Sequence, residues 1–102
     1  MNQSNNILSM LSLATKAGKT VSGEFSTENA IKSGKACLVL VAGDASANTK
    51  KMFTNMCNYY KVPLYIFSTK LELGHCMGKE KRASMAITDV GFADSVKKKL
   101  VN

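Results

Sequence analysis

The chain has 102 residues, 45% of them hydrophobic, and its 14 Lys and Arg against 7 Asp and Glu give a formal net charge of +7. This length supports one hydrophobic core and excludes two, and the ordinary apolar content excludes a disordered chain, so we expect a single domain over residues 1–102. No stretch reaches the roughly 18 apolar residues of a membrane span, and the N-terminus lacks the positive start of a signal peptide, which favours a soluble, cytoplasmic protein.

The first third of the chain predicts two helices joined by a short extended piece. Apolar residues recur on one helical face over residues 5–17, and Gly18 is a natural stop, so a helix is expected there. Residues 20–22 are expected to be extended. A second helix should cover about residues 23–33, with an acidic residue in its first turn and Gly34 as its C-terminal break.

The middle of the chain predicts two buried strands around a third helix. Residues 37–42, CLVLVA, have no polar member, as in a central strand that is covered on both faces. Ser46 can cap a helix that ends near Tyr60, and five residues would form its core stripe: Met52, Phe53, Met56, Cys57 and Tyr60. Residues 64–67 follow a Val-Pro turn and are typical of another buried strand.

The last third predicts a short helix, a charged loop, a strand and a terminal helix. The short helix begins at Ser68 or Thr69 and stops at Gly78, and the loop KEKR covers residues 79–82. Residues 84–88 can form the last strand, and helical spacing resumes at Phe92, Ala93, Val96 and Leu100. Because strands alternate with helices, the order predicts an α/β domain with a small sheet between helical layers.

Side chains that could catalyse a reaction are sparse. The single histidine, His75, is next to Cys76, and adjacent helical residues point about 100° apart, so a partly buried structural role is expected for it. The carboxylates are scattered, and an odd number of cysteines without a C-x-x-C spacing predicts reduced thiols. We therefore expect no enzymatic activity, no cofactor and no bound metal.

The positive charge favours a polyanionic partner, and two segments could contact one. The helix over residues 23–33 is polar in its first two turns, which leaves Phe25, Ala30 and Ile31 to anchor it to the sheet. A helix start presents backbone N–H groups that suit phosphates, so this segment favours RNA, with an ordinary solvated amphipathic helix as the alternative. The second segment is the loop GKEKRAS at residues 78–84, which concentrates three cations.

Three stretches occur in order along residues 8–96: SGEFSTENAIKSGKACLVLVAGDAS, NTKKMFTNMCNYYKVPLYIF and ELGHCMGKEKRASMAITDVGFA. Together they resemble the kink-turn RNA-binding ribosomal protein superfamily, and most closely its small bacterial branch of YlxQ-like ribosomal-protein homologues. The resemblance implies a three-layer α/β/α sandwich with a four-stranded mixed sheet. It also implies that the start of the second helix and the loop before the last strand lie together. The helix start would contact tandem sheared G·A pairs, and the loop would pack on a flipped-out base.

The resemblance and the charge pattern together predict a set of RNA-binding residues. Lysines and the arginine would meet phosphates, Gly23 would permit close backbone approach, Ser26 and Asn29 would touch bases or sugars, and Phe25 could anchor the helix or stack. Phe25-Ser26 stands where the family usually has Asn-Glu, and Asn29 stands where it usually has lysine. The full set is Lys19, Gly23, Glu24, Phe25, Ser26, Asn29, Lys32, Lys35, Lys79, Lys81, Arg82 and Ala83.

The expected function is that of a non-enzymatic RNA-binding protein, associated with the ribosome or with another structured, kink-turn-like RNA. We expect a monomer that does not bind membranes. The alternative is a protein-interaction module that keeps the fold without specific RNA recognition and binds its partner through the third helix, with Met56 and Tyr59 as anchors.

Overall fold

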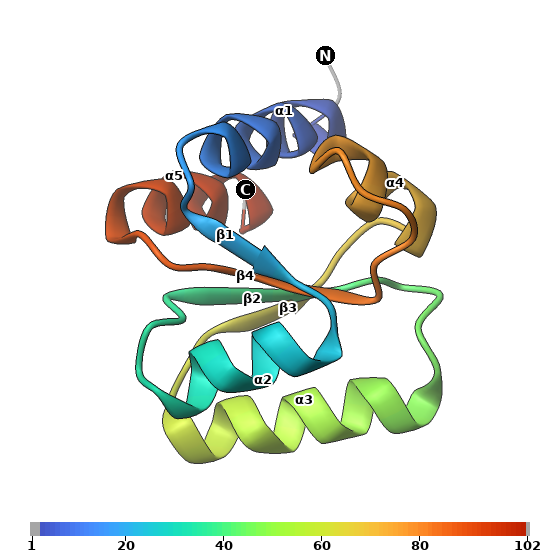
Figure 1. Ribbon diagram of the computed structural model, residues 1–102, viewed down its shortest axis with the longest axis vertical. Coiled ribbons are helices and arrows are strands. Elements are labelled where there is room, and N and C mark those ends of the chain that lie inside the picture. Colours follow the sequence, from blue (N-terminus) through green and yellow to red (C-terminus); the bar gives the residue numbers. More distant parts are fainter. Residues whose placement is uncertain (1–2, 102) are drawn as a thin grey trace.

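A four-stranded mixed sheet with the order β1-β4-β2-β3 lies between two layers of helices in the computed structural model, which describes residues 3–101 (Figure 1). Helices α2 and α3 cover one face of the sheet, and α1, α4 and α5 lie on the other (Figure 1). This arrangement is the three-layer α/β/α sandwich that the resemblance implied. None of the helices in the described part of the chain is long and apolar enough to cross a bilayer.

The helices begin and end within about two residues of their predicted limits. Predicted and observed ends differ most at the first helix, which starts earlier than the apolar pattern indicated. Their bounds are Gln3–Lys16 for α1, Glu24–Lys32 for α2, Ala47–Tyr60 for α3, Lys70–Cys76 for α4 and Val90–Leu100 for α5. Three of these helices start at a side chain that accepts a hydrogen bond from the first turn, and the caps are Ser46, Thr69 and Asp89.

The strands are short, and their order is not that of the sequence. They are Thr20–Ser22 for β1, Leu38–Val41 for β2, Leu64–Ile66 for β3 and Ser84–Ile87 for β4. Strand β4 pairs antiparallel with both β1 and β2, whereas β2 and β3 are parallel. The two central strands, β2 and β4, are buried along their whole length, and the apolar run at residues 37–42 predicted this for β2.

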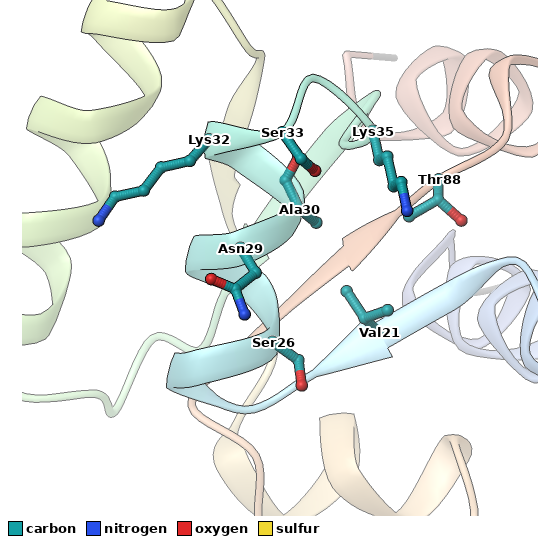
Figure 2. Close-up of a pocket in the computed structure, with 8 residues that line it drawn as sticks. All are labelled: Val21, Ser26, Asn29, Ala30, Lys32, Ser33, Lys35 and Thr88. Carbon is teal, nitrogen blue, oxygen red and sulfur yellow. The ribbon is translucent and has the colours of Figure 1, made fainter.

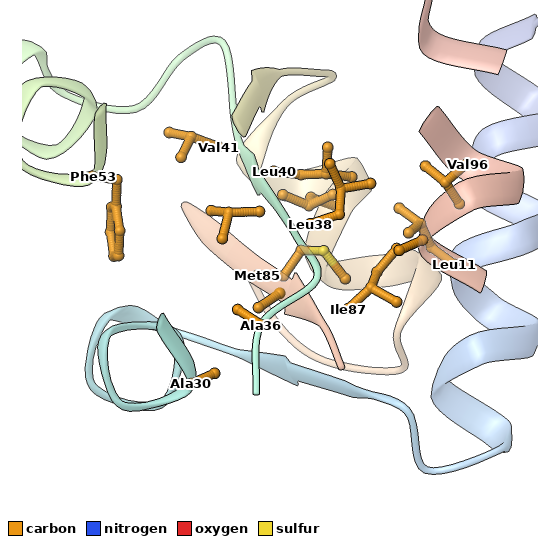
Figure 3. Close-up of a cluster of buried hydrophobic side chains, with 14 of the residues drawn as sticks. Leu11, Ala30, Ala36, Leu38, Leu40, Val41, Phe53, Met85, Ile87 and Val96 are labelled. Carbon is orange, nitrogen blue, oxygen red and sulfur yellow. The ribbon is translucent and has the colours of Figure 1, made fainter. Parts of the chain in front are cut away.

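The core lies on both faces of the sheet, because side chains alternate along each strand. Val41 faces Phe53 of α3, whereas Ile87 faces Leu11 of α1 and Val96 of α5 (Figure 3). Phe53, Leu11 and Val96 are all fully buried. The two layers of helices therefore pack on opposite sides of the same four strands.

The predicted burial of residues 64–67 and of Tyr60 is wrong. Residues 64–67 were expected to form a buried strand, but β3 is at the edge of the sheet and the side chain of Ile66 is 48% exposed. Tyr60 was assigned to the core stripe of α3 and is 41% exposed, because it ends the helix beyond the last buried position, Cys57. In both cases a position that is apolar in sequence lies at the border of the sandwich.

Candidate nucleic-acid interface

The start of α2 has a backbone conformation that only glycine adopts readily. Gly23, the N-cap residue, has φ 90° and ψ 161°, a region that is disfavoured for any residue with a Cβ. No side chain caps the helix at this point. The first-turn N–H groups, which lie at the positive end of the helix dipole, therefore remain available to an anion or to water.

The backbone of Gly23 is also tied to the strand that follows the basic loop. Its N–H donates to the carbonyl oxygen of Ser84 at 3.0 Å. One turn into the helix, Thr27 is fully buried, and its hydroxyl accepts from that of Ser84 at 3.4 Å. The start of α2 is therefore attached to β4 by one backbone bond and one side-chain contact.

The basic loop over residues 79–82 crosses directly over α4. A Cβ added to Gly74 would come within 1.6 Å of the carbonyl oxygen of Glu80, so only glycine allows this crossing. Two backbone bonds hold the loop to the helix: Lys79 N–H donates to the Gly74 carbonyl at 2.9 Å, and Arg82 N–H donates to the Lys70 carbonyl at 3.0 Å. The side chain of Arg82 reaches the edge strand, where Nε donates to Ser22 Oγ at 3.1 Å.

A groove of about 410 Å³ joins the loop to the start of α2. We call it the loop groove. It lies on the α1 side of β1, because the Thr20 hydroxyl is within 2.9 Å of the Thr15 hydroxyl of α1. Its lining residues are Thr15, Thr20, Val21, Ser22, Ser26, Met77, Lys79 and Arg82.

A second groove, of about 610 Å³, lies between β1 and α2 (Figure 2). We call it the helix groove. In Figure 2 the side chain of Lys35 extends toward Thr88, whereas that of Lys32 extends away from the groove. The lining residues are Val21, Ser26, Asn29, Ala30, Lys32, Ser33, Lys35 and Thr88. Val21 and Ser26 belong to both grooves, so the two meet at the edge strand.

Cations line both grooves, and no carboxylate from the described residues 3–101 lines either of them. Of the predicted site residues, six line the grooves: Ser26 lines both, Asn29, Lys32 and Lys35 line the helix groove, and Lys79 and Arg82 line the loop groove. Ala83 is half-buried and packs against the core. Lys81 and Glu24 are exposed beside the loop groove and at the start of α2 respectively, outside both linings.

Two predicted site residues lie differently from their expected positions. Phe25 was expected to anchor α2 to the sheet, but its side chain is 78% exposed, and buried Thr27 occupies the inward position instead. Lys19 lies at the other end of β1 from the basic loop, since its carbonyl accepts from Thr88 N–H at 2.9 Å. The α2 start and the loop are therefore neighbours, but Lys19 is not part of their cluster.

Sequence reasoning did not single out several groove residues: Thr15, Thr20, Val21, Ser22, Ser33, Met77 and Thr88. Most are small polar residues with no motif of their own. They gather only because β1 pairs with β4, which brings residues 20–22 next to residues 85–87. The one available signal was the short extended piece at residues 20–22, placed between two lysine-bearing segments.

The thiols and the histidine do not form a reactive centre. Burial raises the pKa of Cys57 and of Cys76 from 9.0 to about 11, so both thiols are protonated at neutral pH. All three cysteines are free. His75 was predicted to be partly buried and is exposed instead. Within residues 3–101, no group of three His, Cys, Asp or Glu side chains is arranged to hold a metal ion.

Residues 5–97 match the ribosomal protein L7Ae/L30e/S12e/Gadd45 family. The chain is 46% identical over 87 residues to the RNA-binding protein YlxQ of Bacillus subtilis, covering 85% of this chain and 87% of the relative. It is 41% identical over 90 residues to the large ribosomal subunit protein eL30 of Neurospora crassa, covering 82% and 79% respectively. These relatives are RNA-binding and ribosomal proteins rather than enzymes. A solved structure of a protein of unknown function from Bacillus halodurans C has a TM-score of 0.91 at 29% identity and covers 94% of this chain and 97% of its own.

Proposed function

Because the chain belongs to the ribosomal protein L7Ae/L30e/S12e/Gadd45 family, we propose that it is a non-enzymatic protein that binds a structured RNA through the start of α2 and the basic loop at residues 79–82. The observation that carries this proposal is the attachment of the two segments to each other. Gly23 N–H donates to the Ser84 carbonyl, and Arg82 Nε donates to Ser22 Oγ. The uncapped helix start and the loop cations thus face one ligand.

In this proposal, affinity comes from phosphates. Lys79, Lys81 and Arg82 neutralise backbone charges and release counterions, while the first-turn N–H groups of α2 donate to phosphate or sugar oxygens. Within residues 3–101 no carboxylate lines the loop groove, so its cations are available to phosphates. The exposed ring of Phe25 is free to stack on an unpaired base, which is the common way in which proteins hold single-stranded RNA.

Selectivity is expected to differ from that of a kink-turn binder with Asn-Glu at the helix start. Phe25 and Ser26 cannot supply the paired polar contacts to guanine edges, and each such contact is worth about 1 to 3 kcal/mol of discrimination. The chain should therefore bind a kink-turn RNA and related bent RNAs with smaller differences between them. A ribosome-associated and cytoplasmic role belongs to the same proposal, and cosedimentation with ribosomal particles at low salt tests it.

The decisive experiment removes the loop cations together. The triple variant Lys79→Gln/Lys81→Gln/Arg82→Gln should weaken binding to a kink-turn RNA hairpin by about a hundredfold or more at 0.1 M salt, because three phosphate contacts are lost. Fluorescence anisotropy measures the dissociation constant.

The matched control is Lys97→Gln/Lys98→Gln/Lys99→Gln, which removes the same charge from the last turn of α5, where none of the three lysines lines either groove. It should bind almost as the wild type does. Equal losses in the two triple variants would reduce the interaction to net charge and contradict the proposed site.

The protein-interaction alternative has one observation in its favour. Tyr59 on α3 is 78% exposed, and its ring packs edge-on against Tyr60 with centroids 4.9 Å apart. Aromatic residues of this kind are common anchors in protein interfaces. A protein partner bound there would tolerate the triple change in the loop and would be lost on Tyr59→Ala. The loop triple variant and Tyr59→Ala together therefore separate the two functions.

A further inference from the structure

The edge strand β1 separates the two basic grooves. Val21 lies on the α2 side of β1 and lines the helix groove, whereas Thr20 and Ser22 lie on the α1 side. This alternation follows from the pleat of a strand. Because β1 pairs only with β4, nothing in the sheet covers its outer edge. A ligand can therefore reach both grooves from the same side of the molecule.

Lys35 is held over the helix groove by the way in which α2 ends. Gly34 has φ +80°, its N–H donates to the Ile31 carbonyl at 3.2 Å, and Lys35 N–H donates to the Ala30 carbonyl at 2.9 Å. This pair of bonds is the Schellman motif, which reverses the chain after a helix. The reversal directs Lys35 toward Thr88 (Figure 2), and no ion pair engages this lysine within the described residues.

Three other polar side chains of the helix groove are also free to meet a ligand, whereas Ser33 Oγ donates to the Ala30 carbonyl at 3.4 Å. Lys32 pairs with Glu28 at 4.0 Å and extends away from the groove, which leaves Lys35 as its effective cation. Within residues 3–101, no intramolecular hydrogen bond occupies the side chains of Ser26, Asn29 and Thr88. A single cation, two hydroxyls and an amide above the apolar floor of Val21 and Ala30 suit a sugar-phosphate backbone.

We infer that the helix groove binds a second stretch of RNA backbone, on the opposite side of β1 from the stretch held at the loop groove. Lys35 contacts a phosphate there, and the hydroxyls of Ser26 and Thr88 contact phosphate or 2′-OH groups. The inference rests on the proposed function and extends it: the RNA straddles the edge strand instead of ending at the helix start. Val21 and Ser26, which line both grooves, are the point at which the two stretches meet.

The test compares Lys35→Gln with Lys98→Gln, which removes the same charge from the other face of the sheet. With a kink-turn RNA that has two full stems, Lys35→Gln should weaken binding about five- to eightfold at 0.1 M salt and lower the salt slope by about 0.7 to 0.9, the contribution of one phosphate. Lys98→Gln should change neither quantity. If the two variants behave alike, the helix groove does not bind RNA.

Shortening the RNA locates the contact. Each stem is cut back in turn, and one of the two shortened RNAs should bind the wild type more weakly and no longer distinguish it from Lys35→Gln, because the phosphate in question is gone. If Lys35→Gln retains its effect with both shortened RNAs, the second stretch is absent and the inference is wrong.

The proposed function and the second stretch of bound RNA can be disproved separately. If the loop variant Lys79→Gln/Lys81→Gln/Arg82→Gln loses RNA binding while Lys35→Gln retains it in full, that outcome disproves only the binding of a second stretch of RNA in the helix groove. If the wild type itself binds neither the kink-turn RNA nor an uninterrupted duplex of equal length, the proposed function and this inference both fall.

Discussion

At the scale of single residues, the site depends on what glycine permits more than on any reactive group. Gly23 has a φ of +90° with no atom near the position of a Cβ, so its backbone conformation and not the available space excludes other residues. That conformation lets the N–H of Gly23 reach β4 while the helix begins without a side-chain cap. The uncapped first-turn amides of α2, which are proposed to contact RNA, follow from this one residue.

Which side chain of α2 is buried could not be predicted from the sequence. A Phe in the first turn of a helix was expected to anchor it, because apolar residues are usually buried. Thr27 is buried instead, since its hydroxyl finds a partner in Ser84. No property of residues 23–33 alone reveals that partner, because Ser84 is 57 positions further along the chain.

Two buried thiols predict how stability changes at high pH. The pKa values of Cys57 and Cys76 are about 11 in the folded chain and 9.0 when unfolded. Below pH 9 both states are protonated, and between pH 9 and 11 the unfolded state loses its protons first, so the free energy of unfolding falls as pH rises. Cys57→Ala should show a smaller fall in urea midpoint between pH 8 and 10.5 than the wild type. Identical falls would contradict this origin.

At the scale of elements, the loop is positioned by the helix that it crosses. Gly74 leaves no room for a Cβ under the carbonyl of Glu80, and backbone cannot move aside as cheaply as a flexible side chain. Gly74→Ala should therefore displace the basic loop, lower stability by about 1 to 3 kcal/mol and weaken RNA binding at least tenfold. Thermal unfolding and anisotropy measure the two effects.

The control for this change is Leu71→Ala in the same helix, because the side chain of Leu71 is 62% exposed. It should retain both stability and affinity. A Gly74→Ala protein that binds RNA as tightly as the wild type would show that the loop does not need its observed position.

Most elements were predictable because their signals are local. The stripe of α3 and its cap at Ser46 specify that helix, and an unbroken apolar run specifies β2. Strand order is different, because nothing in residues 64–66 shows that β3 has a neighbour on one side only. The adjacency of the α2 start and the loop likewise came from the resemblance, since no periodicity encodes which strands pair.

At the scale of the molecule, one late strand connects everything else. All four residues of β4 are buried, and β4 lies between β1 and β2 and pairs with both. A chain that ends at Ala83 should therefore remain unfolded, since β1 loses its only strand partner and β2 loses one of its two. A chain that ends at Leu100 is the control and should fold. Circular dichroism and amide hydrogen exchange distinguish them, and protected amides in β2 of the shorter chain would refute the prediction.

The late position of β4 in the sequence determines when the nascent chain can complete its sheet. Translation proceeds from the N-terminus, so α2 is made early, whereas β4, to which its start is attached, is made after more than four fifths of the 102 residues. The proposed RNA site is therefore incomplete in a nascent chain that does not yet contain β4. The surface proposed to bind RNA is thus completed only when synthesis of the chain is nearly finished.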